Sequence, residues 1–120
     1  MWLHVCKAKI HRVRITELDL DYEGSISVDE ELLDAAKIIP YEKVQVLNIN
    51  NGERAETYII PAKRRSGTIG LNGALARLAQ KGDHLILITY CMIPEDEATA
   101  HRPKIVLVDN QNHITSVIGG

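Results

Sequence analysis

The stretch Asn50-Asn51-Gly52-Glu53 constrains the fold more than any other part of the chain. An Asn-Gly pair readily supplies the positive φ angles that a tight β-hairpin requires. Strand-like residues lie on both sides, over 44–49 and 54–60, and Pro61 ends the second run. The sequence therefore predicts an antiparallel pair of strands near the middle of the chain.

The rest of the chain predicts more short strands and a few short helices. Apolar and charged residues alternate over 11–16, which predicts a half-buried strand, and over 17–22, which suits an exposed edge strand or extended loop. Asp29 is a favourable N-cap for a helix that ends before Pro40, a second helix is expected over 74–80, and Pro94 can open a helical turn over 94–98. Further strands are expected over 68–71, 84–91, 104–109 and 113–117, with the apolar 84–91 in the centre. Many short strands with two or three short helices predict a small β-barrel, which removes exposed sheet edges by closure.

Composition excludes several classes of protein. The 120 residues fit one domain, and with no phenylalanine and one tryptophan the core must be aliphatic. A net charge of -2 argues against binding to nucleic acid through its phosphates, and no apolar run approaches the length of a membrane span. The start of the chain lacks the layout of a signal peptide. Neither the histidines nor Cys6 and Cys91 have metal-site spacing, so we expect no metal and reduced thiols in the cytoplasm.

The dipeptide Gly24-Ser25 can carry unusual chemistry. A serine Oγ can add to the preceding carbonyl and move the acyl group from nitrogen to oxygen. The resulting ester can eliminate, which leaves a dehydroalanine that hydrolyses to a pyruvoyl group. Glycine before the serine tolerates the strained backbone angles that would bend the carbonyl toward the hydroxyl. Taken alone, however, a Gly-Ser pair is far more often a plain turn.

The strand after the hairpin carries three further candidates. Arg54 can bind a carboxylate through two parallel hydrogen bonds, Thr57 offers a short hydroxyl, and Tyr58 offers a phenol that can donate a proton. Alternation along a strand places Arg54 and Tyr58 on one face and Thr57 on the other. One site can include all three only through a bulge, a twist or a subunit boundary. Spacing alone favours an exposed arginine and two ordinary strand residues.

Taken together, these segments resemble the aspartate 1-decarboxylase family, whose members depend on a pyruvoyl group. No single segment is specific, but the ordered set is, and it covers about residues 1–95. The segments that match, in the order and spacing of the family, are Lys9-Ile10-His11-Arg12, Tyr22-Glu23-Gly24-Ser25, Leu32-Leu33-Asp34-Ala35-Ala36, Asn51-Gly52-Glu53-Arg54, Thr57-Tyr58, Asn72-Gly73-Ala74 and Gly82-Asp83.

The resemblance implies a mainly β fold, the double-psi β-barrel with short helices, in a homotetramer whose sites lie at subunit interfaces. That assembly would resolve the problem of the two strand faces. The implied reaction is decarboxylation of L-aspartate to β-alanine and CO2 for pantothenate and coenzyme A synthesis. Autocatalytic cleavage at Gly24-Ser25 would give a β chain, residues 1–24, and an α chain, residues 25–120, that begins with a pyruvoyl group made from Ser25. Thr57 would help steer the acyl shift, and a requirement for a maturation factor stays open.

The resemblance also implies the roles of the site residues. The pyruvoyl group would form a Schiff base with the substrate amine and act as an electron sink. Tyr58 would reprotonate the carbanion, and Arg54 and Lys9 would hold the two substrate carboxylates in an order that stays open. The pocket would be lined by Asn72 and the backbone of Gly73, Ala74 and Leu75. Leu75 replaces the alanine usual in the family, and we expect its larger side chain to narrow the pocket or shift the helix.

Two alternatives stay open at this point. The first is an inactive or regulatory relative that keeps the barrel and never cleaves, which an intact mass would reveal. The second is a β-barrel binding module that uses the basic loop Lys63-Arg64-Arg65 to hold a nucleic acid or an acidic partner. A salt-dependent binding assay separates that module from an enzyme, although a solvated loop is the favoured interpretation.

Overall fold

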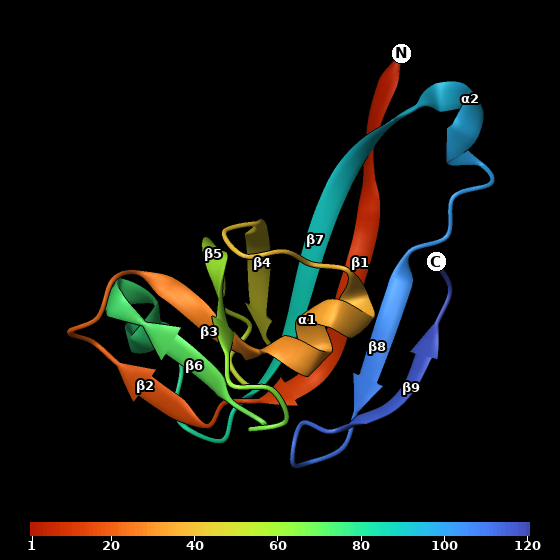
Figure 1. Cartoon of the computed structure of the whole chain (residues 1–120). Helices are drawn as coiled ribbons and strands as arrows, with labels where there is room; N and C mark the ends of the chain where they lie inside the picture. Colours follow the sequence, from red (N-terminus) through yellow and green to blue (C-terminus); the bar gives the residue numbers. More distant parts are fainter.

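The computed structural model of the chain describes residues 1–120 and is built mainly from β-strands (Figure 1). The strands are β1 (Trp2–Arg14), β2 (Glu17–Asp19), β3 (Ser25–Asp29), β4 (Lys43–Asn48), β5 (Arg54–Ala62), β6 (Ile69–Asn72), β7 (His84–Pro94), β8 (Lys104–Val108) and β9 (Ile114–Ile118). The helices are α1 (Glu30–Ala36), the 3-10 helix η1 (Gly73–Leu78) and α2 (Glu95–Ala98). None of these helices is long and apolar enough to cross a membrane.

The hairpin predicted around Gly52 is confirmed, with a wider loop than expected. Strands β4 and β5 pair antiparallel, and the Asn48 amide donates to the Glu53 carbonyl at 2.8 Å. Gly52 has a φ of 77°, but Asn51 is not among the residues with positive φ. The turn therefore needs only one left-handed residue, and it spans residues 49–53 between the strands.

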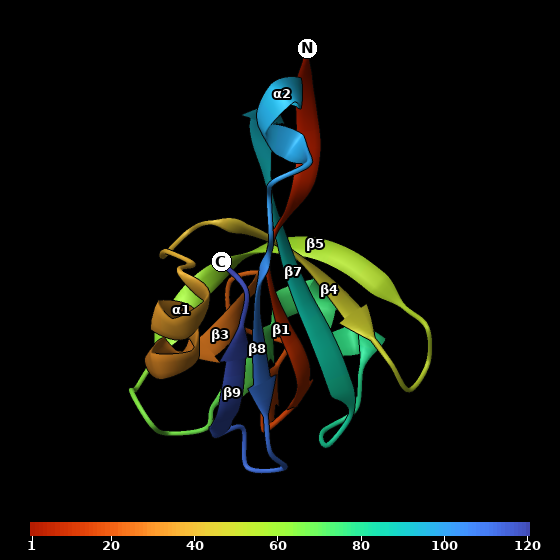
Figure 2. The same cartoon turned by 90° about the vertical axis from the view of Figure 1, so that its right-hand side faces the viewer.

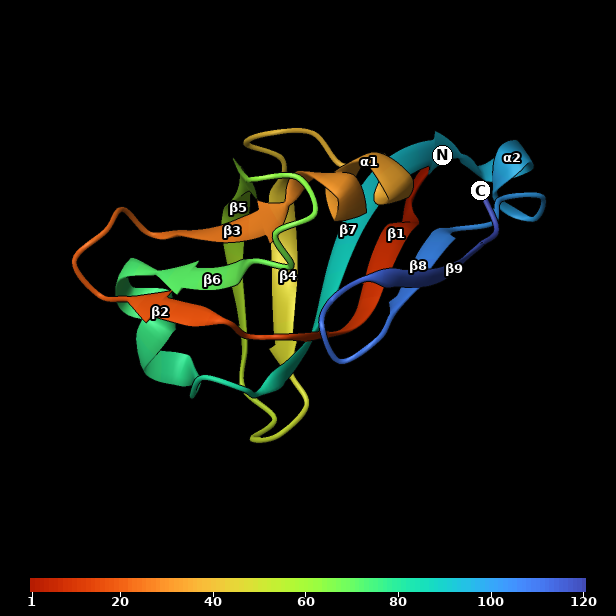
Figure 3. The same cartoon turned by 60° about the horizontal axis from the view of Figure 1, so that its bottom comes forward.

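The strands form one sheet in the order β2-β6-β3-β5-β4-β7-β1-β8-β9. Strand β7 pairs with both β4 and β1, which confirms its predicted central place. In Figure 3, strands β2, β3 and β6 run across the direction of β4 and β7. This mainly β architecture with short helices agrees with the expected fold class and is consistent with a double-psi β-barrel.

The core is aliphatic, as the composition requires. Twenty buried side chains form one cluster, which includes Ile10, Ile26, Ile59 and Leu87. Strands β1 and β7 extend beyond this cluster as a two-stranded ribbon, with the N-terminus and α2 at its tip (Figure 2). The ribbon accounts for an elongated shape of 44 × 27 × 25 Å.

Four boundaries differ from the sequence predictions. Strand β1 begins at Trp2, long before residue 11. Residues 25–29 form β3, which was not expected as a strand although Ser-Ile-Ser-Val-Asp alternates polar and apolar residues; four of the five are buried. Strand β5 continues through Pro61, because β4 pairs no further than Tyr58 and a missing N–H costs nothing on the free side. The helix expected over 74–80 is the shorter η1, and no side chain caps it.

Candidate functional site

Ser25 lies at the start of β3, fully buried, and its hydroxyl is held from two sides. Ser25 Oγ donates to the Glu23 carbonyl oxygen at 2.9 Å and accepts from Asn72 Nδ2 at 3.0 Å. The same Asn72 nitrogen also donates to Ser27 Oγ at 3.0 Å. The hydroxyl is thus oriented next to the Gly24-Ser25 peptide bond, and bulk water is excluded from it.

The register of β3 against β6 produces this arrangement. The two strands are antiparallel, with Ser25 directly opposite Asn72, so both side chains project from the same face. Asn72 is itself only 5% exposed, and its amide therefore needs internal partners. Sequence reasoning placed Asn72 at the site but missed Ser27, although a Ser-x-Ser spacing on a strand predicts two hydroxyls on one face.

The glycine with a left-handed backbone beside the Gly24-Ser25 bond is Gly73. Gly73 has a φ of 68°, whereas Gly24 is absent from the residues with positive φ. A Cβ atom added at Gly73 would lie 2.8 Å from Gly24 Cα. Backbone therefore packs directly on backbone beside the Gly24-Ser25 bond.

Tyr58 and Thr57 lie on opposite faces of β5, as alternation predicted. Strands β3 and β5 are parallel, with Ile26 beside Ile59, so the preceding residues Ser25 and Tyr58 share a face. The Tyr58 ring lies 6.1 Å from the ring of Tyr41, centroid to centroid. Thr57 projects from the other face of the sheet, and its side chain makes no hydrogen bond in the structure. Ser25 and Tyr58 therefore lie on the same face of the sheet, and Thr57 lies on the opposite face.

Lys9 and Arg54 share that outer face but lie apart. Lys9 on β1 lies opposite Ile88 on β7, and Ile88 lies opposite Gln45 on β4. Arg54 on β5 lies opposite Leu47 on β4. Strands β7 and β4 lie between β1 and β5, so Lys9 is three strand spacings from β5, roughly 14 Å along the sheet. Within one chain, Lys9 is therefore not brought next to Ser25.

The side chain of Leu75 belongs to the hydrophobic core. It is 9% exposed and lines a narrow recess with Arg54, Val46 and Leu71 among others. The recess has about 10 Å³ of free space, room for one water at most. Ala74, the residue before it, is exposed. The Leu75 side chain thus fills the core beneath η1. Only the Leu75 backbone can line a pocket together with Asn72 and Gly73.

The outer face near Lys9 is electropositive. Burial lowers the pKa of His11, and the neighbouring positive charges of Lys9 and Arg12 lower it further. His11 lies opposite Ile86 in the same row as Leu47 and Arg54. Lys9 and Arg12 have no acidic partner in the structure, and two unpaired cations suit a site that receives an anion. No group of acidic, histidine and cysteine side chains is arranged to hold a metal ion.

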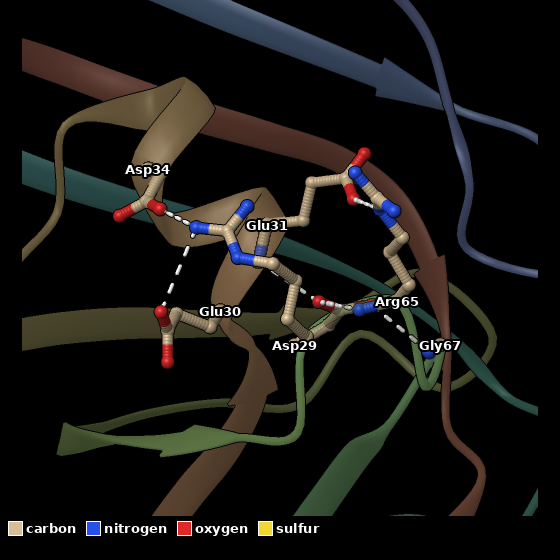
Figure 4. A network of polar contacts seen from close by, with 7 residues as sticks. Asp29, Glu30, Glu31, Asp34, Arg65 and Gly67 are labelled. Atoms are coloured by element: carbon tan, nitrogen blue, oxygen red, sulfur yellow. Dashed lines mark hydrogen bonds and ion pairs between the residues drawn. The ribbon is translucent and has the colours of Figure 1, made fainter.

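Both arginines of the basic loop are paired with acidic residues. Arg64 pairs with Asp34 and Glu30 of α1, and Arg65 Nε donates to Glu31 at 3.0 Å. Figure 4 shows Glu30, Glu31 and Asp34 of α1 facing the loop that carries Arg65. Because acidic residues of α1 pair with both arginines, the loop offers less free positive charge than a nucleic-acid binding module needs.

Comparison with known proteins agrees with this arrangement. The model of the family described as aspartate decarboxylase matches residues 1–115. An aspartate 1-decarboxylase of Anoxybacillus flavithermus is 53% identical over 118 residues, 98% of this chain and 93% of the relative. One of Caldicellulosiruptor saccharolyticus is 56% identical over 117 residues, 98% of this chain and 91% of the relative. One of Bacillus subtilis is 50% identical over 119 residues, 99% of this chain and 94% of the relative. The resemblance inferred from the sequence is confirmed, and it extends past residue 95.

Proposed function

The chain belongs to the aspartate decarboxylase family, and we propose that it converts L-aspartate to β-alanine and CO2 through a pyruvoyl group made from its own Ser25. The β-alanine would serve pantothenate and coenzyme A synthesis. The observation that carries this proposal is the buried Ser25 hydroxyl, fixed by Glu23 and Asn72 beside the bond that it would break. The free thiols of Cys6 and Cys91 agree with a reducing cytoplasm.

Cleavage would begin with addition of Ser25 Oγ to the Gly24 carbonyl carbon. The hydroxyl proton passes to the Ser25 nitrogen as the C–N bond breaks, which leaves an ester between Gly24 and Ser25. Loss of the Ser25 Cα proton and rupture of the Cβ–Oγ bond then release the Gly24 carboxylate and leave a dehydroalanine. Water adds, ammonia leaves, and residue 25 becomes the pyruvoyl group at the start of the α chain.

The residues around Ser25 fit this chemistry. Asn72 Nδ2 already donates to the attacking oxygen, and the hydroxyl must release the Glu23 carbonyl before Oγ can add to the Gly24 carbonyl carbon. Thr57 is proposed to hydrogen bond the intermediate. Because its side chain projects from the other face of β5, this role requires a local movement during cleavage or a Thr57 supplied across a subunit boundary.

In the decarboxylation itself, the pyruvoyl group supplies a carbonyl that takes up the electrons left by the departing carboxylate. Arg54 and Lys9 would each hold one of the two substrate carboxylates through charge-assisted hydrogen bonds. Tyr58 would return a proton to the substrate carbon. Asn72, with the backbone of residues 73–75, would close the pocket.

A homotetramer would complete this site. Lys9 lies strands away from Ser25 within one chain, so a neighbouring subunit is proposed to bring the missing groups across an interface. Large apolar side chains remain on the surface of the single chain and would be covered there. They include Trp2, Ile39, Tyr41, Tyr90 and Met92.

The test is an activity assay with a matched serine control. The purified protein should release β-alanine from L-aspartate, and Ser25→Ala should release none. Ser27→Ala should retain activity, because Ser27 binds the same Asn72 nitrogen but lies two residues beyond the bond to be cleaved. Purification without other proteins also shows whether a maturation factor is needed. Formation of β-alanine by Ser25→Ala would refute the pyruvoyl mechanism.

A further inference from the structure

Gly73 makes the closest backbone approach to the Gly24-Ser25 bond. A Cβ atom at position 73 would lie 2.8 Å from Gly24 Cα, 2.9 Å from Gly24 N and 3.0 Å from the Tyr22 carbonyl oxygen. All three are backbone atoms, so no side-chain rotation can relieve the contact. Its neighbour Asn72 is fixed opposite Ser25 by the β3–β6 ladder, so Gly73 cannot withdraw easily.

The contact is one-sided. A Cβ atom added at Gly24 would meet nothing within 4 Å, and Gly24 has no positive φ. Residues 22–24 can therefore pack closely on the end of β6 only because position 73 has no side chain. A side chain at position 24 would not disturb this packing.

We propose that Gly73 is a positioning residue for chain cleavage: its lack of a side chain fixes where the Gly24 carbonyl lies relative to Ser25 Oγ. Ser25 is held by Asn72, which is its partner in the β3–β6 ladder and also donates to its Oγ, whereas Gly24 lies just outside β3. A side chain at position 73 would push Gly24 away while Ser25 stays in place. This inference rests on the proposed cleavage, because it names what sets the geometry of that step.

Two variants and one control separate contact from backbone strain. Gly73→Ala adds the close contact between its Cβ atom and Gly24, and it also forces an alanine into a backbone conformation with positive φ. Gly73→Asn adds the same Cβ atom, but asparagine tolerates the left-handed region. Gly52→Ala carries the strain alone, because Gly52 has a φ of 77° and nothing within 4 Å of an added Cβ. Uncleaved precursor, isolated early in expression, is followed by intact mass, and thermal melts report the fold.

Both Gly73 variants should cleave on the order of 100-fold more slowly than wild type, a typical penalty for an ångström-scale misplacement, while Gly52→Ala keeps the wild-type rate. A Gly73 variant that cleaves at the wild-type rate would overturn the proposal, and so would Gly73 variants that no longer fold. A wild-type chain that stays intact would refute the proposed function instead. In the uncleavable Ser25→Ala background, Gly73→Ala should shift the Gly24 amide resonance and Gly52→Ala should not; an unmoved Gly24 resonance would overturn the positioning role independently of cleavage.

Discussion

The Ser25 hydroxyl is already oriented in the uncleaved chain. One hydrogen bond, to the Glu23 carbonyl, must be given up before Oγ can attack, and a typical hydrogen bond contributes only about 1 kcal/mol. That cost is small beside the barrier of an otherwise inert peptide bond. The position of the Gly24 carbonyl, and not the freedom of the hydroxyl, is therefore expected to limit cleavage.

Tyr58→Phe should separate maturation from catalysis. The phenol projects from the face of Ser25, but the bonds that hold Ser25 Oγ come from Glu23 and Asn72. The variant should therefore cleave normally, as seen by intact mass, and lose decarboxylation because the proposed proton donor is gone. Tyr41→Phe is the matched control, since Tyr41 contacts the Tyr58 ring and would lose only its hydroxyl. Wild-type turnover by Tyr58→Phe would exclude Tyr58 as the donor.

His11 should make stability fall as the pH drops below about 6.5, the ordinary histidine pKa. Burial, with Lys9 and Arg12 nearby, lowers the pKa of His11 in the folded state. The unfolded chain then binds more protons in this window, so stability rises with pH through it and is lost as pH falls. Urea unfolding at pH 5.5 and 7.5 should show a smaller loss for His11→Gln than for wild type. Equal losses would contradict the lowered pKa. Asp83, whose pKa the Asn48 hydrogen bond lowers, affects stability only at lower pH.

Single residues show where sequence reasoning stops. Ser25 and Tyr58 could be named in advance because their side chains carry recognisable chemistry, and Asn72 because of the family resemblance. The close approach of Gly73 to Gly24 could not, because it depends on the register between two strands far apart in the sequence.

Helix α1 and the loop after β5 form one unit around Asp29. Its Oδ1 accepts from the amides of Glu31 at 2.8 Å and Arg65 at 3.0 Å, and its Oδ2 accepts from the Gly67 amide at 2.9 Å (Figure 4). Asp29 therefore caps the helix, as the sequence predicted, and also holds a loop that is distant in sequence.

Asp29→Ala should destabilise the protein by at least about 2 kcal/mol, because it removes an N-cap and leaves buried amides without partners. Asp29 is 2% exposed. Asp34→Ala is the control: it removes an exposed ion pair with Arg64 and should cost less than about 1 kcal/mol. Denaturant unfolding at one protein concentration measures both. Equal costs for the two variants would contradict the anchoring role of Asp29.

The elements that could be predicted carry local signals. The β4–β5 hairpin has its Asn-Gly, α1 has its N-cap, and β7 has a continuous apolar run. Strand β3 carries such a signal in its alternation of polar and apolar residues, but it is only five residues long and was overlooked between a Gly-Ser turn signal and the N-cap of α1. Its serines are satisfied by Asn72, and the strand lies between β5 and β6. The first half of β1 was missed because it leaves the core as part of a ribbon, where alternation has no buried face to mark.

On the scale of the whole molecule, assembly is the main expectation. Within one chain, strands β7, β4 and β5 separate Lys9 on β1 from Ser25 on β3. Large apolar side chains also remain exposed on the β1–β7 ribbon. Closed symmetric assembly would cover such surfaces. Light scattering at micromolar concentration should give the mass of a tetramer. An active monomer would contradict the proposal that subunits share the site.

The central claim is that the chain cuts itself between Gly24 and Ser25, and one denaturing mass spectrum tests it. Mature protein should show two chains, residues 1–24 and 25–120, with the second carrying a pyruvoyl group in place of Ser25. Ser25→Ala should give one chain of 120 residues. An active preparation in which every chain is intact, with an unmodified Ser25, would contradict the account.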